Sequence, residues 1–196
     1  MVPGLRALIR EMFRHVIGLL IGSWMVAVVC TCEPPSGGSV RDHADLNLAG
    51  VQALGKGELD EAVDFFGRAN AIQPQNPEYL NNLGVVALRR NQVNEAAQYF
   101  TRATIADATY TRAHYNLGVA YQALKNDPLA IAAYKRTLEL QSDAVEAYFN
   151  LGIVYSRSGK KPEALESYKK FVARATPDYV RQIEDAKKKI RELESK

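Results

Sequence analysis

Small and aromatic residues recur along the chain with a fixed step of 34 residues. Three sets of positions keep this step without insertion or deletion: Gly50, Gly84, Gly118 and Gly152; Ala62, Ala96, Ala130 and Ala164; Phe66, Phe100, Tyr134 and Tyr168. Within each unit the apolar positions follow the period of an amphipathic helix in two short stretches. The pattern therefore predicts a series of units, each made of two helices joined by a turn.

The glycine lies midway along the first predicted helix of each unit, where it costs about 1 kcal/mol relative to alanine. A close approach of the second helix explains its presence, because glycine has no side chain to hold that helix away. The alanine and the aromatic residue are four positions apart on the second helix and share one face. We expect this face to be the packing stripe of the second helix.

This pattern resembles the tetratricopeptide repeat, a helix–turn–helix unit with the same period. The resemblance covers about residues 43–178 and includes an Asn-Leu-Gly motif that ends at Gly84, Gly118 and Gly152. It implies an all-α, right-handed superhelical solenoid of four repeats, at 43–76, 77–110, 111–144 and 145–176. In the third repeat we expect Asp127 to be the N-cap of the second helix, because a proline follows it.

A last helix is expected over residues 177–196, with Thr176 as its N-cap. Its apolar residues form one stripe: Tyr179, Ile183, Ala186, Ile190 and Leu193. Charged residues cover its other faces, as in a helix that caps the end of a solenoid, and Phe171 is expected to pack beneath it. A coiled-coil or partner-binding helix is the alternative, although the stripe is only about two heptads long.

The N-terminal segment has the layout of an export signal, with Arg6, Arg10 and Arg14 before an uncharged apolar run over 16–31. This run is shorter than the roughly 20 residues that span a bilayer. Three interpretations stay open. They are a lipoprotein signal with lipid on Cys32 or Cys30, an uncleaved anchor whose basic end is cytoplasmic, and ordinary secretory cleavage.

Residues 1–32 are therefore expected to be an export signal or membrane anchor, followed by a flexible linker over 33–42 that is rich in proline and glycine. All three interpretations place the repeats in the periplasm or otherwise outside the cytoplasm. In the lipoprotein and uncleaved-anchor interpretations, the N-terminal segment also attaches the chain to the membrane.

Candidate catalytic chemistry is sparse. The sequence contains no glycine-rich phosphate loop, His-Glu-x-x-His motif or nucleophile elbow. Its two cysteines are too few for a structural zinc site, and a net charge of +3 is too weak to indicate nucleic-acid binding. His114 occupies a packing position of the repeat, where we expect a satisfied, partly buried side chain. We expect no enzyme activity, metal, cofactor or nucleic-acid partner.

The sixth position of three repeats is an asparagine: Asn82, Asn116 and Asn150. The resemblance places first helices on the concave surface, so these amides are expected to form a ladder there. An amide donates and accepts hydrogen bonds and can satisfy the backbone of an extended peptide. The alternative is that these asparagines hold neighbouring repeats together.

Other inward-facing positions add aromatic, amide and basic groups to this predicted groove: Arg89, Tyr115, Gln122, Phe149 and Arg157. Buried aromatic residues and arginines are typical of peptide-binding surfaces. The carboxylate clamp of chaperone-tail-binding members of the family is not reproduced, because the first repeat has Asn47 and Val51 where that clamp uses lysine and asparagine. A cytosolic co-chaperone is therefore not expected.

Together these features predict a non-catalytic scaffold that binds a protein or peptide partner in its concave groove and is tethered outside the cytoplasm. The overall layout resembles the tetratricopeptide lipoproteins that assemble type IV pilus secretins. Two other hypotheses are a subunit that recruits or regulates a periplasmic or cell-wall enzyme, and a self-assembling structural module.

Overall fold

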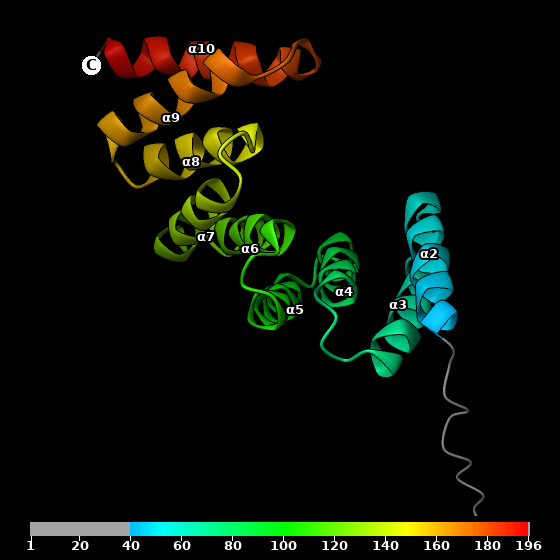
Figure 1. The fold of residues 1–196 in the computed structure, drawn as a ribbon. Coiled ribbons are helices and arrows are strands. Elements are labelled where there is room, and N and C mark those ends of the chain that lie inside the picture. Colours follow the sequence, from blue (N-terminus) through cyan, green and yellow to red (C-terminus); the bar gives the residue numbers. More distant parts are fainter. Residues whose placement is uncertain (1–39, 196) are drawn as a thin grey trace, which may run out of the picture. The chain divides into compact units, whose positions relative to one another are not determined.

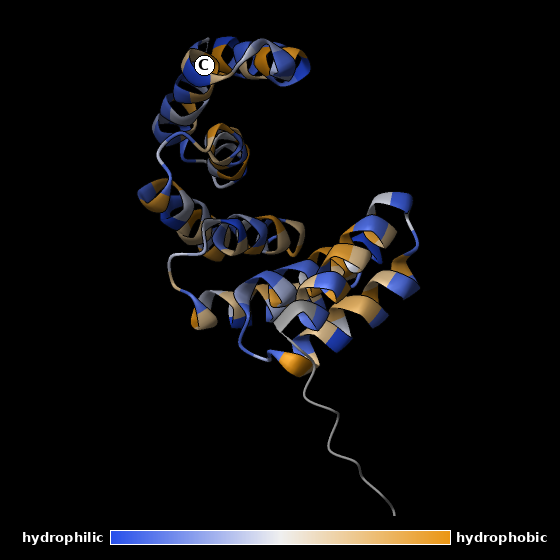
Figure 2. Cartoon of the chain, turned by 45° about the vertical axis from the view of Figure 1, so that its right-hand side comes forward, coloured by the Kyte–Doolittle hydropathy of each residue, from blue (hydrophilic) through white to orange (hydrophobic). Residues whose placement is uncertain are grey.

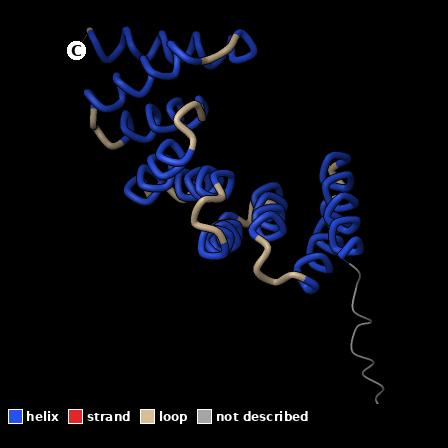
Figure 3. The backbone as a smooth tube through the Cα atoms, in the orientation of Figure 1, coloured by secondary structure: helices blue, strands red, loops and turns tan. Residues whose placement is uncertain are grey.

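The computed structural model describes residues 40–195, which are all-helical and contain no strand (Figures 1 and 3). The helices follow one another in the order α2 (Val40–Lys56), α3 (Leu59–Ile72), α4 (Pro77–Arg89), α5 (Val93–Ala106), α6 (Thr111–Ala123), α7 (Asp127–Leu140), α8 (Val145–Arg157), α9 (Lys161–Arg174), the 3-10 turn η1 (Pro177–Tyr179) and α10 (Val180–Glu194). The expected all-α fold is confirmed. Cys30, Cys32 and the predicted export segment lie outside the described residues.

Consecutive helices pair as the 34-residue step predicts, in the pairs α2/α3, α4/α5, α6/α7 and α8/α9. The second helix of each pair also packs against the first helix of the next pair, so the main helix contacts within residues 40–195 join neighbouring repeats. Figure 2 shows hydrophilic and hydrophobic residues mixed along the helices, as expected where one face of a helix is buried. This is the nearest-neighbour construction of a solenoid.

The repeated glycines mark the closest approach between the two helices of each pair. A Cβ atom built on Gly118 would lie 2.6 Å from Cε1 of Tyr134, which is too close for any real contact. The other three glycines show the same relation to the aromatic residue 16 positions later: Gly50 to Phe66, Gly84 to Phe100 and Gly152 to Tyr168. The expectation that glycine allows the second helix to approach is confirmed, and its partner is the aromatic ring.

Two predicted helix caps differ from the structure. The N-cap of α7 is Asn126, whose side chain accepts a 3.3 Å hydrogen bond from the Leu129 amide, and α7 itself begins at Asp127. The Asp127 carboxylate instead binds Arg157 and the Ser158 hydroxyl. Thr176 precedes the short turn η1 rather than α10 and makes no capping bond to the backbone. Side-chain partners from a neighbouring helix, which local sequence does not reveal, account for the change at Asp127.

The last helix packs as a cap on α9. Ala186 and Phe171 are both fully buried, and the Phe171 ring lies 6.0 Å from that of Tyr179 in an edge-on arrangement. The remaining residues of the predicted stripe, Ile183, Ile190 and Leu193, pack against the same core. Ala186 follows Gly152 by 34 residues, so α10 occupies the place of the first helix of a fifth unit. The capping helix is therefore confirmed and keeps the register of the repeats.

Candidate functional site

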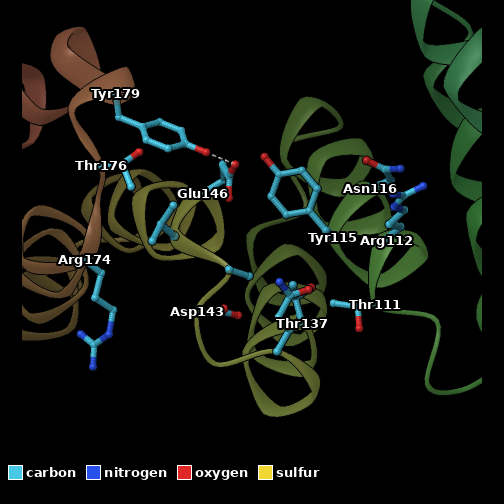
Figure 4. Close-up of a pocket in the computed structure, with 13 residues that line it drawn as sticks. Thr111, Arg112, Tyr115, Asn116, Thr137, Asp143, Glu146, Arg174, Thr176 and Tyr179 are labelled. Atoms are coloured by element: carbon cyan, nitrogen blue, oxygen red, sulfur yellow. Dashed lines mark hydrogen bonds between the residues drawn. The ribbon is translucent and has the colours of Figure 1, made fainter.

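A groove of about 830 Å³ lies between α6, α8 and the chain segment that leads into α10 (Figure 4). Tyr115 and Asn116 contribute to it from α6, Glu146 from the first turn of α8, and Tyr179 from η1. The α6–α8 groove, as we call this site, is completed by Thr111, Arg112, Thr137, Gln141, Asp143, Ala144, Val145, Arg174 and Thr176.

A smaller pocket of about 210 Å³ shares Tyr115, Glu146 and Tyr179 with the groove. Its other lining residues are Phe149, Asn150, Phe171 and Gln182. We call this second site the aromatic pocket, because four of its seven lining residues are Tyr or Phe. The two sites are continuous through the three residues that they share.

The structure brings four of the predicted binding residues together in these two sites, and the other four lie elsewhere. Tyr115 and Asn116 line the groove, while Phe149 and Asn150 line the aromatic pocket with Tyr115. Asn82, Arg89, Gln122 and Arg157 line neither. Whether any of these residues contacts a partner stays a prediction.

The three asparagines each donate a hydrogen bond to the residue 35 positions earlier in the chain. Asn116 Nδ2 donates to Asn81 Oδ1 at 2.8 Å, and the other two bonds run from Asn82 to Asn47 at 2.9 Å and from Asn150 to the Tyr115 hydroxyl at 3.1 Å. The amides therefore connect first helices of neighbouring repeats, as the alternative interpretation predicts. The Asn116 bond uses one amide N–H, so an N–H and an oxygen of this side chain remain to meet a ligand.

The predicted groove arginines also connect repeats. Arg89 donates to the Leu54 carbonyl at the end of α2, at 2.9 Å. The Arg157 Nε atom lies 2.9 Å from Asp127 Oδ1, and its Nη2 reaches the Gln122 carbonyl at 3.4 Å. The hydrogen bond from Arg157 lowers the pKa of Asp127 below its ordinary value, and the Ser158 hydroxyl contributes in the same direction.

Two tyrosines and a carboxylate form the boundary between the groove and the aromatic pocket. In Figure 4 the Tyr115 and Tyr179 hydroxyls point toward one another with Glu146 between them. The Tyr179 hydroxyl donates to Glu146 Oε1, and this bond raises the pKa of Tyr179 to about 12. Burial raises the pKa of Tyr115, so both phenols are neutral hydrogen-bonding groups at physiological pH.

Glu146, Tyr179 and Arg112 are site residues that sequence reasoning missed. Glu146 and Arg112 occupy the second position of their repeats, and none of the predicted binding residues occupies that position. Tyr179 was expected only in the packing stripe of the cap. The signal that could have identified it is the register, because Tyr179 follows Val145 by 34 residues and so begins a fifth unit.

The described histidines are satisfied structural residues. His114 is partly buried and its Nε2 lies 3.0 Å from the Ala108 carbonyl, as expected for a packing position. His43 is buried between the Tyr79 hydroxyl at 2.6 Å and the Gln73 side chain at 3.0 Å.

Within residues 40–195 no three His, Cys, Asp or Glu side chains are grouped to hold a metal ion. In the same range, no helix is both long and apolar enough to cross a membrane.

Two family models described as tetratricopeptide repeat match the chain, at residues 53–115 and 109–176. Among solved structures, the MamA protein is 25% identical, with 79% of this chain and 87% of that chain covered and a TM-score of 0.66. A tetratricopeptide protein of the thermophile Thermus thermophilus is 24% identical over 77% of this chain and 80% of its own, with a TM-score of 0.61.

A third structure contains a bound peptide. It is the first tetratricopeptide domain of Spaghetti (RPAP3) bound to the HSP90 peptide SRMEEVD, 25% identical to this chain. The match covers 61% of this chain and 94% of that domain, with a TM-score of 0.59. No curated protein matches the chain. The family matches together span residues 53–176, from within α2 to just past the end of α9, and the chain is therefore a tetratricopeptide-repeat protein.

Proposed function

We propose that this chain is a protein-binding scaffold that holds an extended segment of a partner protein in the α6–α8 groove. The observation that carries the proposal is the convergence of Tyr115, Asn116 and Tyr179 on one open site of about 830 Å³. Tetratricopeptide proteins generally act as non-catalytic scaffolds, and the groove supplies hydrogen-bonding and aromatic groups rather than a reactive constellation.

The chemistry of the groove suits a peptide backbone. Asn116 uses one amide N–H toward Asn81, which leaves an N–H and Oδ1 for a backbone carbonyl and amide. Tyr115 is half-buried, and its oxygen accepts a bond from Asn150, which leaves its hydroxyl proton to donate to a ligand. Ordering by neighbouring repeats lowers the entropy that these side chains lose on binding.

The RPAP3 domain supports the proposal because a related arrangement of helices binds a peptide there. It does not supply the identity of the partner. In this chain the first repeat has Asn47 and Val51 at the positions expected to clamp a terminal carboxylate, and the Asn47 amide already donates to Glu78 at 2.9 Å. We therefore propose an internal segment of a partner rather than an acidic C-terminal tail.

Selection from a random linear peptide library, with the full-length chain immobilised, tests this function. Selected peptides should bind the wild-type chain and lose affinity for the Tyr115→Ala variant by about tenfold or more. Tyr99→Ala is the matched control, since Tyr99 is also partly buried but lies on α5 and lines neither the groove nor the aromatic pocket. Equal losses in both variants, or no selected peptide at all, would reject the proposed function.

We also propose that residues 1–32 direct the scaffold to the outer side of a membrane, where it could serve assembly of an envelope complex such as a type IV pilus secretin. The arginine-flanked apolar run that ends in Cys30 and Cys32 supports this location. Mass spectrometry of the mature N-terminus separates lipid on a cysteine, an intact Met1 and a free end beyond Cys32. Recovery of the intact chain in the cytosolic fraction alone would reject the proposal.

A further inference from the structure

The aromatic pocket carries a single charged side chain. Of its seven lining residues, Glu146 alone is an acidic or basic residue, and the others are aromatic or amide residues. Arg112 and Arg174 line the wider groove but not this pocket. A ligand group that enters the pocket therefore meets one negative charge and aromatic walls.

The Glu146 carboxylate is available to a ligand. Within the described residues its hydrogen-bond partner is the Tyr179 hydroxyl, which occupies Oε1, and it forms no ion pair there. A carboxylate offers about four lone-pair positions, so one hydrogen bond leaves most of its capacity unused. Glu146 also lies in the first turn of α8, where the helix dipole stabilises its negative charge.

Aromatic rings line the same pocket as this carboxylate. The Phe149 ring lies 5.0 Å from the Phe171 ring and 6.1 Å from the Tyr168 ring, so its orientation is fixed by packing. Tyr115 is fixed in the same way, with its ring 5.8 Å from that of Tyr134. Rigid aromatic faces next to a carboxylate attract a cation through the ring quadrupole as well as through charge.

We propose that the aromatic pocket binds an arginine side chain of the partner peptide, with the guanidinium on Oε2 of Glu146 and against the Tyr115 and Tyr179 rings. Arginine fits better than lysine, because its planar group stacks on aromatic faces and is less strongly hydrated. The Asn150 and Gln182 side chains line the same pocket and provide acceptor oxygens for the remaining guanidinium donors. This assignment rests on the proposed function and adds the residue that the groove selects.

The test uses heptapeptide pools with random flanks and a fixed central residue: arginine, citrulline, lysine or leucine. Citrulline is the critical comparison, since it keeps the shape of arginine and removes its charge. Binding to the full-length chain should be about tenfold stronger for the arginine pool than for the citrulline pool. Glu146→Gln should reduce the ratio of arginine-pool to citrulline-pool affinity to about one, and a ratio that stays near tenfold would overturn the assignment.

Two further variants complete the test. Glu163→Gln removes an exposed carboxylate that lines neither site, and it should keep the arginine preference. Tyr179→Phe frees Oε1 of Glu146 while keeping the ring, and it should preserve or strengthen the preference. Equal binding of the arginine and citrulline pools, with binding still lost in Tyr115→Ala, would overturn the arginine assignment alone. If all four pools bind and none loses affinity in Tyr115→Ala, both the arginine assignment and the proposed function are overturned.

Discussion

Asn116 donates a 2.8 Å hydrogen bond from its side-chain amide to Oδ1 of Asn81. Asn81 directly precedes Asn82, which is the residue equivalent to Asn116 in the preceding repeat. Asn81 is only 4% exposed, so its oxygen has little access to water if this donor is lost. The same register joins Asn82 to Asn47 and Asn150 to Tyr115. Repeat stacking and the proposed peptide site therefore depend on the same side chains.

Replacement of Asn116 by alanine should lower the free energy of unfolding by about 1–3 kcal/mol, because it leaves the buried Asn81 oxygen without its donor. Asn82→Ala is the internal comparison and should cost less, since its acceptor Asn47 is only half-buried. Urea unfolding followed by circular dichroism measures both. An Asn116→Ala effect no larger than that of Asn82→Ala would contradict the argument that burial of the acceptor sets the loss of stability.

Gly118→Ala and Gly67→Ala should change stability in opposite directions. A methyl group on Gly118 would lie 2.6 Å from the buried Tyr134 ring, and the resulting strain should cost about 1–3 kcal/mol. Gly67 lies inside α3 with no atom within 4 Å of a new Cβ, so alanine there should stabilise the protein by about 0.5–1 kcal/mol. Thermal unfolding of the two variants checks this. Equal midpoints would mean that the glycine–ring contact is not close.

Asp127→Asn should remove a stabilising charge interaction that depends on pH. Arg157 holds the pKa of Asp127 below its ordinary value of 3.8, so the interaction is fully present above 3.8 and is lost as pH falls through the folded-state pKa. Because the pair is close to the surface, we expect a loss of about 0.2–1 kcal/mol at neutral pH.

Urea unfolding at about pH 7 and about pH 2.5 measures the difference between wild type and Asp127→Asn, which should shrink at the acidic pH. Asp64→Asn, at the exposed i,i+4 pair with Arg68, provides the control and should have a smaller effect at neutral pH. A wild-type-to-variant difference that is the same at both pH values would argue against the assigned role of Asp127.

Phe171→Ala should loosen the capping helix. Phe171 is fully buried among Phe149, Tyr179 and Ala186, and its truncation should cost about 3–5 kcal/mol. Phe65 is only partly buried, and its truncation should cost less. Amide hydrogen exchange should show α10 losing protection while α4 keeps it, because each repeat contacts only its neighbours. Uniform loss of protection would indicate a single cooperative core instead.

The regular part of the fold could be predicted because it depends on local pattern. Gly118 and Tyr134 recur with the period, and the contact between them follows from the helix–turn–helix unit. The function of Asn116 could not be decided in this way, since either a peptide or the preceding repeat could satisfy its amide. The structure identifies the partner as Asn81, which is 35 residues away in the chain.

The candidate site was predicted only in part because it joins residues from separate structural elements. Tyr115 and Phe149 were identified from their repeat positions, but Glu146 and Tyr179 were not. Their importance arises where the turn η1 brings Tyr179 to the first turn of α8, and a sequence read repeat by repeat contains no sign of that contact. Extending the 34-residue register into α10 is the reasoning that would have brought the two together.

Photo-cross-linking tests the central claim, peptide binding in the α6–α8 groove, most directly. A peptide selected on the full-length chain would carry benzophenone at its centre, and mass spectrometry would locate the adducts. We predict adducts on α6, on α8 and around Tyr179, with loss of these adducts in Tyr115→Ala but not in Tyr99→Ala. Adducts confined to α3 or α5, which contribute no residue to the groove or the aromatic pocket, would contradict the account.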